Sequence, residues 1–306
     1  MPKQRRKRKL YIFLSILAWF ATVFLFLFYS PFAQFRVLWI NTAMYSSRHQ
    51  FLATALYSKS YIAKVLDIPF PEEQTNAEPL REAFDNSVLF AEIKGDYFRG
   101  YLIRIEDPRR LALVPVVNEE GELLEDLIAA HQGFGGVNGG GYRDEKRRGL
   151  PWGTVIADGA LVSVCAEHRL HTIGGLTRSH KLVVGRMSDQ EILERDFEWA
   201  FEFGPMLIVN GAKTVLNSLS GGLAPRTAIG QTKAGHILLL VIDGRKPSSI
   251  GATFQDVQMV LYANDAMNAI SLDGGASSCM VYNGALVNNP SEGNSGRLLP
   301  NAILFR

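Results

Sequence analysis

The chain has 306 residues, of which 47% are hydrophobic and 20% are charged. This composition excludes a disordered chain and suits one large domain with accessory segments, or two domains. The net charge is +2, but residues 3–9 carry six positive charges, which leaves −4 for the rest of the chain. A mildly acidic body argues against nucleic acid as a partner, because phosphate backbones are bound by clustered basic side chains on a folded face.

The N-terminal segment has the pattern of a membrane anchor. Residues 10–28 contain no charge and are mostly Leu, Ile, Phe, Val, Ala and Trp. A helix of that length measures about 28 Å, which suffices to cross a hydrocarbon core of about 30 Å. The apolar run exceeds the core of a cleaved signal peptide, no A-x-A-like site follows it, and a buried core helix is the alternative. We therefore predict a cytoplasmic basic tail at 1–9, a transmembrane signal anchor at 10–30 in the lipid bilayer, and an extracellular remainder.

The next segment separates the predicted anchor from the main domain. Residues 31–66 contain no acidic residue and are rich in apolar and aromatic side chains, whereas residues 68–80 contain three prolines and several acids without periodicity. The first part suggests a juxtamembrane stalk with helical stretches, or a helical cap on the main domain, and the second part a linker. We assign 31–84 to the stalk and linker and 85–306 to the main domain.

Short apolar runs between glycine turns dominate residues 85–306 and predict β-strands. These runs are 101–105, 111–117, 155–164, 181–184, 206–209, 236–242, 269–272, 279–282 and 302–305. Helical patterns are fewer and cover 123–131, 189–202 and 253–264, the last with Thr253 as a cap. The expected fold class is α+β, with a large mixed β-sheet and a few packed helices.

The two cysteines, Cys165 and Cys279, give no clear prediction, because their spacing does not tell whether they pair. No CxxC motif and no metal-type spacing of His and Cys occurs. We predict no cofactor and no metal site, although Ca²⁺ or Mg²⁺ held by carboxylates stays open.

Four polar clusters are each flanked by glycine or follow an apolar run. They are GGVNGGGY at 135–142, APRTAIG at 224–230, VIDGR at 241–245 and LDGGASS at 272–278. Glycine allows a ligand to approach the backbone and leaves N–H groups to face an anion. An aspartate at a strand end suits acid, base or nucleophile chemistry, and arginine matches phosphate or carboxylate. Ordinary turns are the alternative for any single cluster.

In this order, the clusters resemble the motifs of the phosphodiester glycosidase family. The matching segments are 137–142, 151–159, 225–230, 243–245, 272–278 and the near-terminal P-N-A at 300–302. The resemblance covers about residues 90–306. Gly141-Tyr142, Ala276 and Cys279 depart from the usual residues without removing a charge. The resemblance implies a hydrolase that cleaves the C1–O bond of a sugar-1-phosphodiester.

Because a phosphodiester is a weakly basic leaving group, catalysis can rest on stabilising its charge and an oxocarbenium-like transition state. We predict Asp273, Asp243 and Arg226 as catalytic residues. The predicted substrate-binding residues are Asn138, Gly139, Gly140, Thr227, Arg245, Gly274, Gly275, Ser277 and Ser278. The strand–helix–strand pattern around residues 253–264 predicts parallel neighbouring strands, which would bring both aspartates to one pocket with Arg226 and the Asn138 loop.

Two other functions remain open at this point. A catalytically inactive protein that binds or assembles sugar-phosphate polymers would use the same arginines. A cation-dependent phosphodiesterase would cut the P–O bond, with the aspartates as ligands. The predicted anchor suggests a substrate in the cell envelope or an exopolysaccharide of a bacterium.

Overall fold

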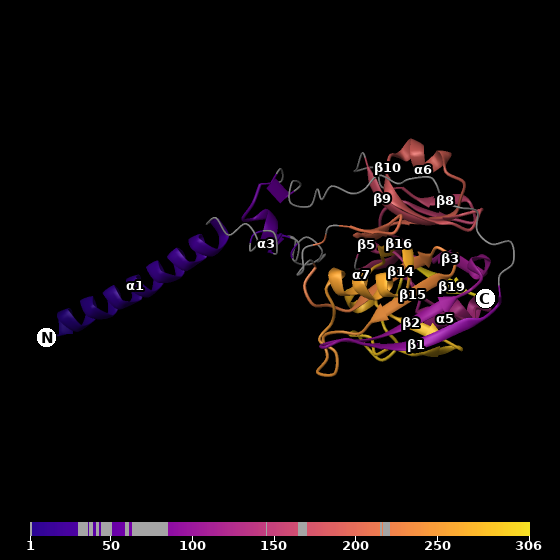
Figure 1. Cartoon of the computed structure of the whole chain (residues 1–306). Helices are drawn as coiled ribbons and strands as arrows, with labels where there is room; N and C mark the ends of the chain where they lie inside the picture. Colours follow the sequence, from indigo (N-terminus) through magenta and orange to yellow (C-terminus); the bar gives the residue numbers. More distant parts are fainter. Residues whose placement is uncertain are drawn as a thin grey trace. The chain divides into compact units, whose positions relative to one another are not determined.

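The computed structural model describes residues 2–29, 36, 39–40, 43, 51–58, 61–62, 85–144, 146–164, 170–214, 216 and 221–306. The chain divides into two compact units, residues 1–68 and 69–306. The first unit contains the helices α1 (Pro2–Tyr29) and α3 (Phe51–Thr54) (Figure 1). It also contains a small apolar cluster of Ile40, Ala43, Ala53 and Ile62. Within the part of the chain that the structure describes, no helix is both long and apolar enough to cross a membrane. The predicted transmembrane helix is therefore not confirmed.

Three antiparallel sheets build the second unit. A seven-stranded sheet has the order β1 (Val88–Lys94), β2 (Arg99–Ile105), β15 (Ile237–Ile242), β14 (Arg226–Thr232), β16 (Ala266–Ser271), β12 (Met206–Val209), β13 (Ala212–Lys213). A five-stranded sheet has the order β10 (Leu182–Met187), β9 (His171–Thr177), β11 (Phe197–Glu202), β7 (Val155–Ala157), β8 (Ala160–Ser163). The third sheet, also five-stranded, has the order β18 (Ala285–Leu286), β17 (Met280–Tyr282), β4 (Gly135–Asn138), β19 (Asn301–Phe305), β3 (Leu111–Pro115).

The remaining elements are short. The strands β5 (Tyr142–Asp144) and β6 (Arg147–Pro151) form a separate hairpin. The helices are α5 (Leu124–Ala130), α6 (Asp189–Glu194) and α7 (Phe254–Ala263), with 3-10 turns at Pro108–Arg110 and Gly275–Ser277. In Figure 1 the sheet with β8, β9 and β10 lies above the other two sheets, and α6 covers its upper side.

One apolar core joins the three sheets, and each sheet has a helix on its other face. The shared core contains Ile103 of β2, Trp199 of β11 and Ile303 of β19, all nearly inaccessible to solvent. Separate clusters place α7, α5 and α6 against the first, third and second sheets, respectively. The central strands of each sheet are therefore covered on both faces, whereas the edge strands β1 and β8 are largely exposed.

The central strand β15 shows why an uninterrupted apolar run forms here. Ile237, Leu239 and Val241 enter the shared core, whereas the intervening Leu238, Leu240 and Ile242 pack towards α7. All six side chains are at most 1% exposed. Burial of each contributes about 1.5–3 kcal/mol, which fixes the register of the strand and the position of the residue that follows it.

The helix α7 begins as its sequence predicts. The Thr253 hydroxyl accepts from the Asp256 N–H at 3.1 Å, and the Asp256 carboxylate accepts from the Thr253 N–H at 2.8 Å. This capping box satisfies two backbone donors that the first turn leaves open. The helix then buries Phe254, Val257 and Leu261 against the seven-stranded sheet.

Three predictions about the elements need correction. The α+β class is confirmed, but the pairings between the described strands are antiparallel, so the sheet is not mixed. The predicted helix at 189–202 ends at Glu194, because Phe197, Trp199 and Phe201 alternate with polar or small residues and form β11. The predicted strand at 155–164 is a hairpin of β7 and β8 around Gly159, whose φ is +74°.

Two predictions depend on residues that the structure does not fully describe. Cys165 lies outside the described residues, so its pairing with the buried Cys279 stays untested. The predicted boundaries at residues 9, 30 and 84 also stay predictions.

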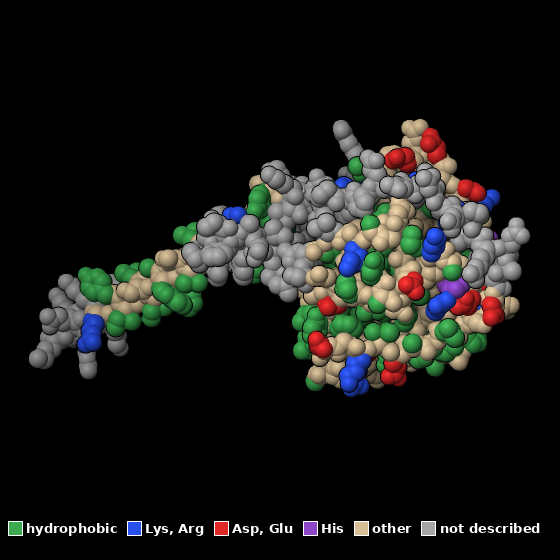
Figure 2. Space-filling view, in the orientation of Figure 1, with side chains coloured by type: hydrophobic (Ala, Val, Ile, Leu, Met, Phe, Trp, Pro, Cys, Tyr) green, Lys and Arg blue, Asp and Glu red, His purple; other side chains and the backbone are tan. Residues whose placement is uncertain are grey.

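In Figure 2 the visible face of the second unit mixes basic, acidic and apolar side chains, with acidic side chains grouped over α6.

Candidate active site

Three strand ends bring the predicted catalytic residues to one edge of the seven-stranded sheet. β15 and β16 both pair antiparallel with β14, which lies between them. They therefore run in the same direction, and Asp243 and Asp273 follow their ends at the edge where Arg226 begins β14. The prediction that these strands are parallel neighbours is wrong. The inserted β14 still gives them a common edge, with the strand ends about 10 Å apart instead of about 5 Å.

The Asn138 amide connects the third sheet to this edge. Its Nδ2 donates to the Asp273 carbonyl at 2.7 Å, while its Oδ1 accepts from the Thr227 hydroxyl at 2.8 Å and the Cys279 N–H at 3.2 Å. Asn138 and Thr227 are both 0% exposed. The substrate-binding role predicted for them stays a prediction. They hold the backbone that carries Asp273.

The glycines after Asn138 allow a close approach of two chain segments. The Gly139 carbonyl accepts from the Asp273 N–H at 3.1 Å, and the Gly140 N–H donates to Asn301 Oδ1 at 2.7 Å. A Cβ atom on Gly139 would lie 2.0 Å from Asn301 Oδ1, so a side chain is excluded there. Asn301 is 0% exposed and was missed as a site residue, although it stands in the P-N-A motif that the sequence shows.

The Asp273 carboxyl group has the most unusual environment at this edge. Its side chain is partly exposed, and the dense protein around it raises its pKa from 3.8 to about 6. The nearby Ser277 hydroxyl, the charge of Arg297 and the Gly274 N–H oppose that effect. At neutral pH Asp273 is therefore mostly ionised but close to its titration point, which suits a general base or a nucleophile.

The two serines that follow Asp273 are buried but have spare hydrogen-bonding capacity. Ser277 and Ser278 are each 1% exposed. Neither Oγ has hydrogen-bond geometry to another atom among the described residues, although Ser277 lies close enough to Asp273 to affect its pKa. Because buried hydroxyls normally have a hydrogen-bond partner, these two serines can bind a group of a ligand near Asp273.

The Asp243 carboxylate holds the loop at Asn288 and Asn289 in place. Asn288 Nδ2 and the Asn289 N–H both donate to Asp243 Oδ1 at 3.0 Å, and the Asn289 N–H also lies 3.2 Å from Oδ2. The side chain is buried, and burial raises its pKa, while these donors and Lys246 act in the opposite direction. Asn288 also donates to the Ser278 carbonyl and accepts from the Met280 N–H. Asp243 therefore supports the segment after Asp273. Asn288 was not predicted as a site residue.

The Arg226 guanidinium is engaged with the backbone. Its Nε donates to the Ala252 carbonyl at 3.0 Å, and its Nη2 donates to the Gly221 and Gly222 carbonyls at 2.6 and 2.8 Å. Its Cζ lies 3.9 Å from the centre of the Phe254 ring, and the residue is 6% exposed. These contacts hold two loops in place beside the turn at residues 273–275 (the Asp273 turn). The predicted role of Arg226 in holding phosphate stays a prediction, but the contacts favour a positioning role.

Two further arginines border the same turn. The Arg245 side chain is exposed, and its Nη2 would lie 3.2 Å from a Cβ on Gly275. The Arg297 guanidinium lies 4.9 Å from the centre of the Tyr142 ring and close enough to Asp273 to lower its pKa. Arg297 was missed, because it lies in a loop without a strand pattern to place it. The turn therefore has positive charge on more than one side.

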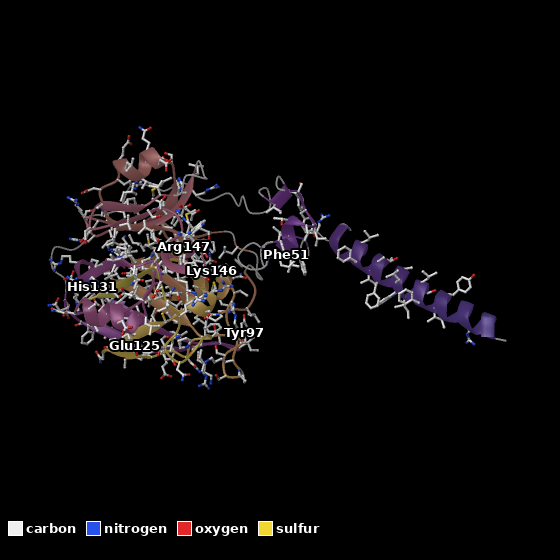
Figure 3. The ribbon with its side chains drawn as sticks, turned by 180° about the vertical axis from the view of Figure 1, so that it is seen from behind. Phe51, Tyr97, Glu125, His131, Lys146 and Arg147 are labelled. Carbon is white, nitrogen blue, oxygen red and sulfur yellow. The ribbon has the colours of Figure 1, made fainter. Side chains whose placement is uncertain are left out.

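A shallow depression elsewhere on the unit contains none of the predicted residues. It is lined by Ala130, His131, Gln132 and Arg306, at the end of β19 opposite Asn301. Tyr97 marks the other end of the sheet, where the site around Asp273 lies. It stands just before the start of β2, which pairs with the end of β15, and its carbonyl accepts from the Ile250 N–H. Figure 3 shows His131 and Tyr97 on opposite sides of the unit. The depression is therefore distinct from the site around Asp273.

Comparison with known proteins agrees with this geometry. The sequence pattern of the phosphodiester glycosidase family matches residues 133–306, and the chain belongs to that family. It is 31% identical over 173 residues to N-acetylglucosamine-1-phosphodiester alpha-N-acetylglucosaminidase of Bos taurus, a match covering 51% of this chain and 32% of the bovine protein. The Mus musculus protein of the same name is 26% identical over 225 residues, covering 65% of this chain and 43% of the mouse protein. The chain thus matches less than half the length of these relatives.

Solved structures show the same fold. The catalytic domain of the zebrafish N-acetylglucosamine-1-phosphodiester alpha-N-acetylglucosaminidase, auto-inhibited by its pro-peptide, superposes with a TM-score of 0.62 at 22% identity. This match covers 76% of the chain and 85% of the zebrafish domain. A hypothetical protein from Synechocystis superposes with a TM-score of 0.57 at 17% identity, covering 72% and 61% of the two chains.

Proposed function

We propose that the chain is a hydrolase that cleaves the C1–O bond of a sugar-1-phosphodiester, with an N-acetylglucosamine-1-phosphodiester as the first substrate to test. The proposal is supported by membership of the phosphodiester glycosidase family and by the names of its relatives. The observation that carries it is the Asp273 carboxyl, with a pKa raised to about 6 on a turn bordered by arginines.

The proposed chemistry needs one working carboxylate. The leaving group is a phosphate monoester, a weak base that departs without a proton donor, so the main requirements are charge stabilisation and a base or nucleophile at C1. Asp273 supplies the latter, because it is ionised above about pH 6 and partly exposed. Asp243 already accepts N–H groups and is buried, so we assign it to positioning. If Asp273 acts as the base, it takes a proton from the attacking water and the configuration at C1 is inverted, whereas attack by Asp273 itself would lead to retention.

The test is an assay of the purified full-length chain against a panel of sugar-1-phosphodiesters, with release of the free sugar as the readout. The wild-type protein should release sugar, and Asp273→Asn should abolish release. Asp265→Asn is a matched control, because Asp265 is an exposed aspartate just before the opposite end of the same strand, β16. Retained activity in Asp273→Asn, or no sugar release by the wild-type protein from any member of the panel, would contradict the proposal.

We also propose that residues 10–30 anchor the chain in the lipid bilayer, with residues 1–9 in the cytoplasm and the second unit outside. The proposal is supported by the uncharged apolar run at 10–28 directly after six cations. An extracellular enzyme would meet envelope or exopolysaccharide polymers, and such a polymer containing sugar-1-phosphodiester links is the proposed natural substrate. Fractionation of cells into membrane and soluble fractions tests the anchoring, and a soluble full-length protein would contradict it.

A further inference from the structure

We propose that Arg297 and Arg245 together hold the phosphate of the substrate, one on each side of the Asp273 turn. The inference rests on the proposed function and identifies the groups that recognise the charged part of the substrate. It replaces Arg226 in that role, because three backbone carbonyls already accept hydrogen bonds from the Arg226 guanidinium.

The Arg297 guanidinium is buried in place yet weakly paired. Its side chain is 11% exposed and lies against the face of the Tyr142 ring. Its Nε is 3.6 Å from Glu292 Oε2, which is beyond normal hydrogen-bond length, and this Nε has no hydrogen-bond partner among the described residues. Glu292 is also shared with Arg148, whose Nη1 lies 3.5 Å from Oε1. A phosphate can therefore replace a loosely held carboxylate at Arg297.

Arg245 reaches the turn from a different strand than Arg297 does. It follows β15, whereas Arg297 comes from the loop before β19, and their guanidinium groups are close to residues 275 and 273, respectively. Arg245 makes no side-chain hydrogen bond or ion pair with the residues that the structure describes. Two planar guanidinium groups near one turn match the several oxygens of a phosphate better than a single carboxylate.

The backbone of Arg245 gives independent support. Its φ is +61°, in the left-handed region that favours glycine, and its N–H donates to the Ile250 carbonyl at 2.9 Å. A bulky residue in this conformation is strained, and such strain is concentrated at functional sites. Gly275, the residue closest to this guanidinium in the turn, also has a left-handed backbone, with a φ of +63°. Arg245 thus combines a left-handed backbone with a guanidinium that lies beside Gly275.

The test compares two substrates that carry the same sugar. One is N-acetylglucosamine 1-(methyl phosphate), whose aglycone already carries a negative charge in the intact substrate, and the other is p-nitrophenyl N-acetyl-α-glucosaminide, whose aglycone is uncharged in the intact substrate. Arg297→Met keeps an apolar stem against Tyr142 but removes the charge. It should lower kcat/KM for the phosphodiester by about 10- to 100-fold, the factor that corresponds to a charged hydrogen bond, and leave the aryl glycoside near the wild-type value.

Arg245→Gly should separate binding from folding. It relieves the left-handed strain, so the melting temperature should stay equal or rise, while kcat/KM for the phosphodiester falls. Arg178→Met is the matched control for Arg297→Met. Arg178 is an exposed arginine that directly follows the last residue of β9 and is paired with Asp196 at 3.3 Å. An equal loss on both substrates in Arg297→Met, or full activity of Arg245→Gly on the phosphodiester, would overturn the inference.

A binding experiment distinguishes failure of this inference from failure of the proposed function. Calorimetric titration of the full-length chain with methyl phosphate should give an affinity that falls about 10- to 100-fold in Arg297→Met. If the wild-type chain cleaves neither substrate, the proposed function fails, and this titration still decides the phosphate site. Unchanged methyl phosphate affinity in both arginine variants would overturn the phosphate site whatever the substrates show. Arg297→Lys, which keeps a charge, should be intermediate and covers the case in which Arg297→Met does not fold.

Discussion

Neutralising Asp273 should make the folded protein more stable at neutral pH while abolishing activity. The structure raises the pKa of this carboxyl from 3.8 to about 6, mainly through burial. At 1.36 kcal/mol per pKa unit, ionisation of the folded protein costs about 3 kcal/mol, and partial exposure of the side chain reduces this to about 1–3 kcal/mol. Because the folded pKa is raised, the stability attached to this group is complete below about pH 4 and is lost as the pH rises to about 6.

The assay is urea unfolding of wild type and Asp273→Asn, followed by tryptophan fluorescence, since Trp199 is buried in the core. At about pH 3 the Asp273 carboxyl group is mostly neutral in both the folded and the unfolded protein, so the difference in unfolding free energy there measures only the change of shape and hydrogen bonding. Between about pH 3 and about pH 8 the variant should gain about 1–3 kcal/mol relative to wild type. A difference that stays constant with pH, or that moves against the variant as the pH rises, would refute the burial argument.

Two other predictions follow from the contacts around this edge, and a third concerns the membrane topology. Asn288→Ala should lower the unfolding free energy by about 2–3 kcal/mol, because it removes the donor to Asp243 and the acceptor of the Met280 N–H; near wild-type urea unfolding would show that the loop is held otherwise. Arg226→Lys should lower both the unfolding free energy, by about 1.5–3 kcal/mol, and turnover, because a point ammonium cannot serve three carbonyls. Wild-type stability with lost turnover would instead return Arg226 to the phosphate. A reporter fused after Arg306 should be active only outside the cytoplasm, and activity inside would contradict the proposed topology.

The strands that the sequence predicted best are those buried on both faces. β15 is apolar at every position, because one set of side chains enters the shared core and the other packs towards α7. By contrast, β9 was missed, since Gly174 and Gly175 lower its strand propensity. Cβ atoms on these glycines would lie 2.7 Å from Ile270 and Ala200, respectively, so close packing requires them. Local propensity does not show such contacts between distant segments.

The sequence indicated which strand ends lie together, but not the direction of the side chains at those ends. The glycine-flanked motifs indicated which strand ends matter, and the sheet brings Asp243 and Asp273 to one edge through the insertion of β14. The pattern could not show that the Asn138 amide faces inward or that backbone carbonyls accept from Arg226. Arg297 was missed because loop residues carry no periodicity that places them in space.

The bond that breaks is the most direct test of the central claim. Hydrolysis of N-acetylglucosamine 1-(methyl phosphate) by the full-length chain in oxygen-18 water, with both products analysed by mass spectrometry, identifies that bond. We expect cleavage at C1–O, which places the label in the sugar and leaves methyl phosphate unlabelled. Label in a phosphate product would show attack at phosphorus and would contradict a glycosidase.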